Sequence, residues 1–234
     1  MGRASTRFLL LIALDHPIPM PELLTLRQTI ETIVACFDDG DVWDRYAWVY
    51  TDRDGPLTTC RFYLSSSDEE TDLLIDEDGE GLPLVAAEHA LSHYLEAVTF
   101  ADVLIVQKRQ RPLSSLEDYA RALDHYVRVD AFLELGEASE TDIDAALHAN
   151  LATGLYTEHD LVLAECPANR VGEAARAVSA LFSLSIAEAL SLCRQLPLSL
   201  GRRVNTLDCG QIERRFAALS LPLQKVTHRA LPWQ

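Results

Sequence analysis

The chain has 234 residues, enough for one large domain or two small ones, and 48% of it is apolar, which excludes a globally disordered protein. Its formal net charge of −16 argues against general binding to nucleic acids or to anionic membranes. No apolar run reaches the roughly 18 residues that a membrane span requires.

The charge is divided unevenly along the chain. Residues 1–159 carry 30 acidic and 11 basic side chains, a net of −19, whereas residues 160–234 carry 6 and 9, a net of +3. Solubility is a sufficient reason for an acidic half, but a basic protein partner or attraction between the two halves would use the same asymmetry. The five cysteines form no CxxC pair and lie in or beside apolar runs, which favours the cytoplasm.

The first part of the chain alternates apolar runs with turn signals, which indicates an acidic α+β body with a mixed sheet. Residues 52–56 (DRDGP) separate two runs rich in aromatic and β-branched residues, the pattern of a hairpin. In chain order we expect a strand at Arg7–Leu14, a helix from Pro21 to Phe37, a hairpin of Val42–Thr51 and Leu57–Ser65, a strand at Thr71–Asp76, a helix at Leu82–Val98, a strand at Asp102–Gln107, and helices at Ser115–Leu135 and Glu140–Leu151.

The last third of the chain has the pattern of a small separate module. A linker within residues 152–157 divides an acidic body, residues 1–153, from this module, residues 158–229. Ser185 is a candidate N-cap and Glu188 completes a capping box, while Pro197 ends that helix. In the order βααβαβ we expect a strand at Asp160–Glu165, a helix at Val171–Leu181, a helix from Ser185 that buries Ile186, Ala189, Leu190 and Cys193, a strand-like turn, a helix from Asp208, and an edge strand at Leu221–Val226.

Several residues of this module, most of them at core positions, have the spacing of a known domain. They are Ile186, Ala187, Glu188, Ala189, Leu192, Pro197, Val204, Ile212 and Phe216. With this spacing, which needs no gap, the module resembles the C-terminal domain of the bacterial ribosomal stalk protein. The adaptor that delivers substrates to the Clp protease shares that fold. The resemblance implies a fold used for docking to other proteins.

The residues that these two families use for binding are replaced here. The stalk domain binds translation factors through lysines and a glycine, and the corresponding positions are Ala187, Leu190 and Gln195. The Clp adaptor holds an N-terminal amine with an Asn-Asp-Asp-like stretch, whose nearest match is Ala-Glu-Cys at residues 164–166. The resemblance therefore implies docking without naming a partner.

A metal site is one interpretation of the histidines in the expected helix Leu82–Val98. His89 and His93 are four residues apart, and Glu96 follows three residues later, so the three would share one helix face. No HExxH motif is present and no further histidine or cysteine completes the set in sequence. A partly exposed helix face without a metal is the alternative.

An acidic loop at residues 76–81 is a candidate contact for an arginine-rich partner. Asp76, Asp78 and Glu80 supply its carboxylates. The alternating ligands and the terminal glutamate of a twelve-residue calcium loop are missing. A solvated turn is the alternative interpretation.

A basic patch on the module is the second candidate contact. Arg202 and Arg203 are expected in a loop, and Arg214 and Arg215 on the third helix of the module. Guanidinium groups bind carboxylates or phosphates. An ordinary solvated surface is the alternative.

No catalytic motif stands out, because the chain has no GxSxG, no phosphate-binding glycine loop and no dinucleotide fingerprint. We therefore expect no cofactor. The first hypothesis is a cytoplasmic, bacterial-type adaptor that binds a protein partner through its stalk-like module and acidic surface. One alternative is an inhibitor or immunity protein that neutralises a basic effector such as a nuclease. Another is an enzyme or metal-binding protein that uses His16, or His89 and His93. The oligomeric state is left open.

Overall fold

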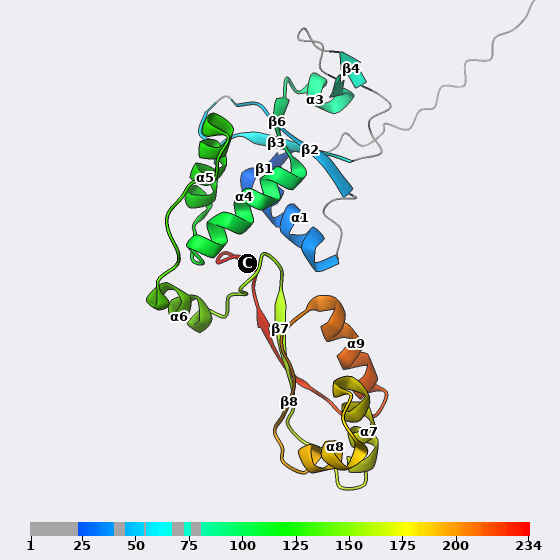
Figure 1. The fold of residues 1–234 in the computed structure, drawn as a ribbon. Helices are drawn as coiled ribbons and strands as arrows, with labels where there is room; N and C mark the ends of the chain where they lie inside the picture. The colour runs from blue at the N-terminus through cyan, green and yellow to red at the C-terminus, as the bar shows by residue number, and fades with distance from the viewer. Residues whose placement is uncertain (1–22, 40–44, 54, 67–72, 76–80) are drawn as a thin grey trace, which may run out of the picture.

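The computed structural model describes residues 23–39, 45–53, 55–66, 73–75 and 81–234. They form two lobes placed end to end, each with helices packed on an antiparallel sheet (Figure 1). The α+β class expected from the sequence is confirmed. Among the described residues no single helix is long and apolar enough to cross a membrane, and only a pair of helices that meet at a bend of 118° passes that test when joined.

The first lobe holds the elements up to residue 148. They are β1 (Leu24–Thr25), α1 (Leu26–Asp39), β2 (Tyr46–Thr51), β3 (Arg61–Ser66), β4 (Leu73–Ile75), β5 (Gly81–Pro83), α3 (Leu84–Glu88), β6 (Ser92–Glu96), α4 (Ala97–Gln110), α5 (Leu116–Val129) and α6 (Glu140–His148). The main sheet has the strand order β1-β3-β2-β6, and β4 pairs with β5 in a separate small sheet.

The central hairpin, β2 and β3, has a different cluster on each face. Val49 and Phe62 belong to the main core, which α1, α4 and α5 complete. Tyr50 and Tyr63 belong to a smaller cluster that includes Ala86 of α3. Successive side chains of a strand point to opposite faces, so the alternation of large residues in this hairpin fills both clusters.

Two predictions for this lobe are wrong. Leu82–Val98 is not one helix, because it divides into β5, α3, β6 and the first residues of α4. Asp102–Gln107 is not a strand but the middle of α4. This helix is buried on several sides, at Phe100, Val103 and Leu104 among others, and a short apolar run of this kind does not distinguish a strand from a buried helix.

The mixed sheet expected for the body is also wrong for the described strands. Every pairing between the named strands is antiparallel. The expectation depended on a strand at Asp102–Gln107, which is helical, and on Arg7–Leu14, which lies outside the described residues. With antiparallel neighbours, short turns are enough to connect the strands.

The second lobe holds β7 (Glu158–Leu163), α7 (Val171–Phe182), α8 (Ile186–Cys193), β8 (Leu198–Asn205), α9 (Thr206–Ala217) and β9 (Gln224–His228). This is the expected βααβαβ order, and the sheet order is β8-β7-β9. The capping box is present: Ser185 accepts from the amide of Glu188 at 3.3 Å, and its own amide donates to that carboxylate at 2.9 Å. The lobe has its own core, which includes Leu161, Val178 and Phe216.

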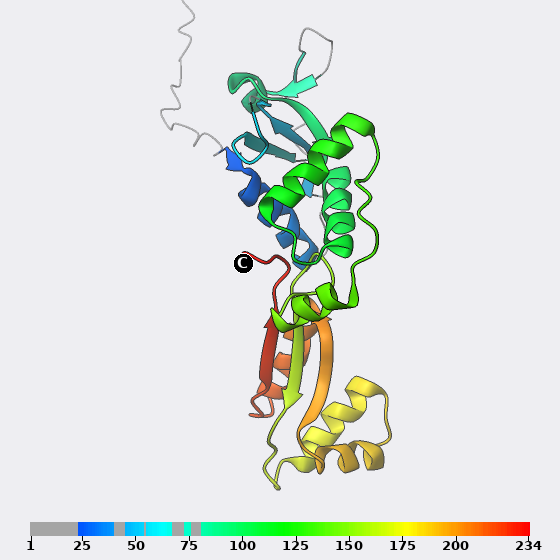
Figure 2. The ribbon, with the colours of Figure 1, turned by 90° about the vertical axis from the view of Figure 1, so that its left-hand side faces the viewer.

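Residues 229–234, which we call the return segment, lead from β9 back to the first lobe (Figure 2). Ala230 and Leu231 are fully buried in the main core of that lobe. The amide of Ala152 donates to the carbonyl of Arg229, and the amide of Arg229 donates to the carbonyl of Asn150, both at 2.8 Å. The lobes are therefore joined by two chain segments that hydrogen-bond to each other.

Candidate functional site

An open groove of about 410 Å³ lies on the second lobe, between the end of α7, strand β8 and helix α9. Most of the residues that line it are apolar, although polar and apolar atoms contribute almost equally to its exposed surface; the main apolar side chains are Leu181, Phe182, Leu200, Val204, Ile212 and Phe216. Phe182 is 41% exposed at the groove. The groove is therefore suited to an apolar side chain from another molecule.

Local backbone features keep this groove open. Gly201 lies in its wall, and a Cβ atom added there would be 2.8 Å from Cγ1 of Val204, so a side chain would occupy the space. Helix α7 ends at Ser183, whose φ of 54° is left-handed. The hydroxyl of Ser179 then donates to the carbonyl of Leu184 at 2.6 Å, which fixes the turn that follows Phe182.

The polar side chains that line the groove are Asp208, Gln211 and Arg215, so the lining carries no net formal charge. Arg215 lines it, and Arg214 is exposed beside it in the last turn of α9. In the part of the chain that the structure describes, neither arginine forms an ion pair. Asp208 also lines the groove, but Nδ2 of Asn205 donates to its carboxylate at 3.1 Å. A carboxylate of a bound partner would therefore find a free guanidinium at this edge.

The basic patch expected from the sequence is divided by the fold. Arg202 and Arg203 lie on strand β8 and not in a loop. Arg202 is exposed, but the guanidinium of Arg203 donates to the carbonyl of Leu151 at 2.7 Å and to the carboxylate of Glu158 at 3.1 Å. Arg203 therefore belongs to the junction of the lobes, and Arg214 and Arg215 are the pair that remains beside the groove.

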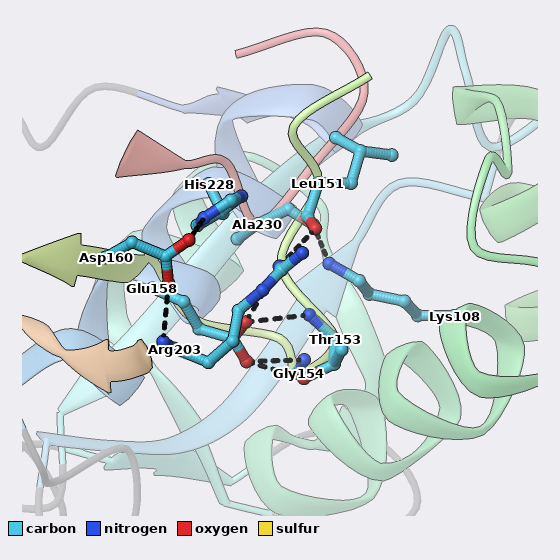
Figure 3. A network of polar contacts seen from close by, with 9 residues as sticks. All are labelled: Lys108, Leu151, Thr153, Gly154, Glu158, Asp160, Arg203, His228 and Ala230. Atoms are coloured by element: carbon cyan, nitrogen blue, oxygen red, sulfur yellow. Dashed lines mark hydrogen bonds and ion pairs between the residues drawn. The ribbon is translucent and has the colours of Figure 1, made fainter. Parts of the chain in front are cut away.

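A buried carboxylate is the centre of that junction (Figure 3). Glu158 is 1% exposed and accepts from the amide of Thr153 at 3.1 Å, from its hydroxyl at 2.6 Å and from the amide of Gly154 at 3.3 Å. Burial alone would raise the pKa of Glu158, but these bonds and the one from Arg203 hold the pKa below its usual value. Glu158 therefore stays charged and holds the linking loop against β8.

Two further contacts extend the junction on either side of this carboxylate (Figure 3). Asp160 accepts from the amide of Arg203 at 2.8 Å and lies 3.0 Å from Nε2 of His228. On the first lobe, the ammonium of Lys108 donates to the carbonyl of Ala230 in the return segment. Burial lowers the pKa of Lys108 to about 8, although Glu158 acts in the opposite direction.

The proposed metal ligands do not share a helix face, so the premise of that site is wrong. His89 is the C-cap that follows α3, whereas His93 and Glu96 lie on strand β6. Nε2 of His93 is 3.3 Å from the hydroxyl of Tyr50. Among the residues with described positions, no group of three histidine, cysteine, aspartate or glutamate side chains is arranged to hold a metal ion.

The acidic loop cannot be placed in the same way. Asp76, Asp78 and Glu80 lie outside the described residues, as does His16. The groove and the junction were not predicted from the sequence. The one signal for the junction is a charged residue, Lys108, within an apolar run, and Lys108 is 2% exposed in the structure.

Comparison with known proteins bears on the first lobe alone. Residues 23–135 match the family model described as "Domain of unknown function (DUF7716)". No curated protein and no solved structure matches the chain. The groove of the second lobe lies outside the matched residues, so its interpretation depends on its own geometry.

Proposed function

We propose that the protein is a non-catalytic, bacterial-type cytoplasmic adaptor that binds a partner protein through the groove of its second lobe. The partner segment would insert an apolar side chain into the groove and place a carboxylate beside Arg215. The observation that carries the proposal is the combination of an open groove lined mainly by apolar residues and the guanidinium of Arg215, which forms no ion pair with any residue whose position is described.

Exposed apolar side chains on the same lobe support the proposal. Phe182, Ile186 and Leu207 are 41%, 48% and 56% exposed. The burial expected for Ile186 is wrong: it is the first residue of α8, and the buried positions of that helix are Ala189 and Cys193. Burial of such side chains contributes about 25 cal/mol per Å².

The distribution of charge supports an acidic partner segment for this lobe. Residues 160–234 carry a net charge of +3, and residues 1–159 carry −19. The first lobe therefore repels an acidic segment, while the second attracts it, so the encounter is directed to the second lobe. The resemblance to the ribosomal stalk domain, a docking fold, adds an argument by analogy.

The state of the cysteines agrees with a reducing compartment. Cys36, Cys60, Cys193 and Cys209 are buried, and Cys166 is partly buried; all five are free thiols. Burial raises the pKa of Cys193 and Cys209, which keeps these thiols protonated and unreactive.

The test is a titration of the full chain with a designed amphipathic peptide of leucine and glutamate, followed by NMR of methyl groups. We expect shifts at Leu181, Val204 and Ile212, and at least tenfold weaker binding for Phe182→Ser and for Arg215→Glu. A peptide with lysine in place of glutamate should not bind.

Matched controls are exposed residues of the same lobe away from the groove. Val226 is 47% exposed on β9, and Arg194 is exposed after α8. Val226→Ser and Arg194→Glu should bind the peptide as the unchanged protein does. Equal losses in these controls, or shifts spread over the first lobe, would contradict the proposal.

A further inference from the structure

A second hollow, of about 540 Å³, lies on the first lobe and has no part in the proposed docking. It is bounded by the residues that follow β2, by Tyr94 of β6 and by one side of α5. A volume of this size suits a small molecule. All its lining residues fall within the stretch that matches the family model.

The charge of this hollow is opposite to that of its lobe. Arg53, Arg121 and Arg128 line it together with Asp124, so the described lining residues carry a formal charge of +2. The sequence up to residue 159 carries a net charge of −19. A cluster of three guanidinium groups is therefore a local exception in an acidic lobe.

The arginines of α5 are on one face of that helix and remain available. Arg121 and Arg128 are seven residues apart, two helical turns. Arg121 pairs with Asp118 at 3.0 Å and Arg128 with Asp124 at 3.1 Å, but the arginine side chains are 63% and 66% exposed. Exposed pairs of this kind contribute little free energy, so an incoming anion can compete for both guanidinium groups.

Arg53 is held in place on the other side of the hollow. Its φ is 50°, a left-handed conformation, and its NH2 group donates to the carbonyl of His93 at 2.9 Å. Its guanidinium carbon lies 5.5 Å from the ring centre of Tyr94, a cation–π contact. A group that is already positioned loses less conformational entropy when a ligand binds.

Tyr94 forms one wall of the hollow. It is 8% exposed and lines the hollow, and within the described structure its hydroxyl has no hydrogen-bond partner. Buried hydroxyl groups are nearly always partnered. The oxygen itself is closed to solvent, so a ligand in the hollow would contact the ring of Tyr94 and would reach its hydroxyl only after a shift of that side chain.

We propose that this hollow binds a small molecule that carries a phosphate monoester. A phosphate monoester has a charge of about −1.5 to −2 at neutral pH, opposite in sign to the formal charge of the lining residues, which is +2, or +1 when the Asp118 paired with Arg121 is counted. Guanidinium groups bind its oxygens in pairs. Leu57 and Val127 supply apolar surface for the rest of the molecule.

The experiment is isothermal titration calorimetry of the full chain with phenyl phosphate, with phenyl sulfate and benzoate as monoanions of similar size. We expect saturable binding that is tightest for phenyl phosphate. Arg53→Gln and Arg128→Gln should each weaken it about tenfold or more, because each removes a charge-assisted hydrogen bond. The control is Arg176→Gln, an exposed arginine of α7 on the other lobe, which should change nothing.

The outcomes that overturn the proposal are equally concrete. They are the absence of saturable binding, binding of benzoate as tight as that of phenyl phosphate, and an equal loss in Arg176→Gln. Thermal unfolding of each variant shows whether it is folded. If Arg53→Gln is not folded, Arg128→Gln decides the matter, because that side chain is 66% exposed and contributes little to the fold.

Discussion

Trp233 lies edge-on against Tyr119, with ring centroids 5.6 Å apart and an angle of 87° between the ring planes. The carbonyl of Trp233 also accepts a hydrogen bond from Arg27 at 3.0 Å. The chain thus leaves the first lobe, forms the whole second lobe and then returns to complete the core of the first. The stability of the first lobe therefore depends on residues that follow the second.

The substitution Trp233→Ala should lower the free energy of unfolding by about 2–3 kcal/mol, because it removes a partly buried aromatic side chain. The loss should be local, with faster hydrogen exchange in α5 around Tyr119. As a control, Val226→Ala, at an exposed position of β9, should have little effect. Faster exchange in β7 and β8 with α5 unchanged would contradict this coupling.

Lys108→Met should change the pH dependence of stability. Burial lowers the pKa of Lys108 from 10.5 to about 8. Between these values the unfolded chain holds the proton and the folded chain does not, so this residue makes stability rise with pH from about 8 to about 10.5. Over this range the free energy of unfolding of the unchanged protein should rise by about 3 kcal/mol through Lys108. This contribution should be absent in Lys108→Met. Urea unfolding of both proteins at pH 7 and pH 10 measures this change in the free energy of unfolding. The same change with pH in the unchanged protein and in Lys108→Met would contradict the prediction.

Glu158→Gln should destabilise the lobe junction by about 2–4 kcal/mol, because it leaves Arg203 without its carboxylate and presents an amide to the donors of Thr153. The pKa of Glu158 is lowered, so its contribution is present above the ordinary glutamate pKa and lost as the pH falls below it. The difference in the free energy of unfolding between the unchanged protein and Glu158→Gln should therefore shrink below about pH 4.

The control for that substitution is Glu173→Gln. Glu173 pairs with Arg170 at 2.9 Å, but its side chain is 43% exposed. Denaturant unfolding should show a loss below about 1 kcal/mol. Equal losses for the two substitutions would mean that the buried network does not hold the lobes together.

Gly201→Ala should cost about 1–3 kcal/mol, because the added methyl group would lie 2.8 Å from Val204. It would also narrow the groove, so the leucine and glutamate peptide should bind more weakly. The double substitution with Val204→Ala should recover part of the stability. The control is Gly210→Ala in α9, where an added Cβ has no other atom within 4 Å. This substitution should stabilise the protein by up to about 1 kcal/mol.

Local sequence patterns predicted the elements whose signals are short-range. The turn residues between β2 and β3 lead to the expected hairpin, and Ser185 with Glu188 forms the expected cap. The predictions that were wrong concern apolar runs, such as Asp102–Gln107, where burial on several sides hides the helical period. The shared helix face of His89 and His93 was wrong for a different reason, because one helix was assumed where the chain has α3 and then β6.

The α+β class, the βααβαβ order of the second lobe and the contrast in charge between the two parts of the chain could all be predicted from the sequence, because each depends on composition or on neighbouring residues. The tertiary structure alone decided that Arg203 turns to Glu158, that Arg53 and Arg121 meet around one hollow, and that Trp233 packs on Tyr119. These pairs are 45, 68 and 114 residues apart. Local propensities act over a few neighbouring residues and cannot predict contacts across such separations in the sequence. These contacts depend on how the elements and the lobes pack.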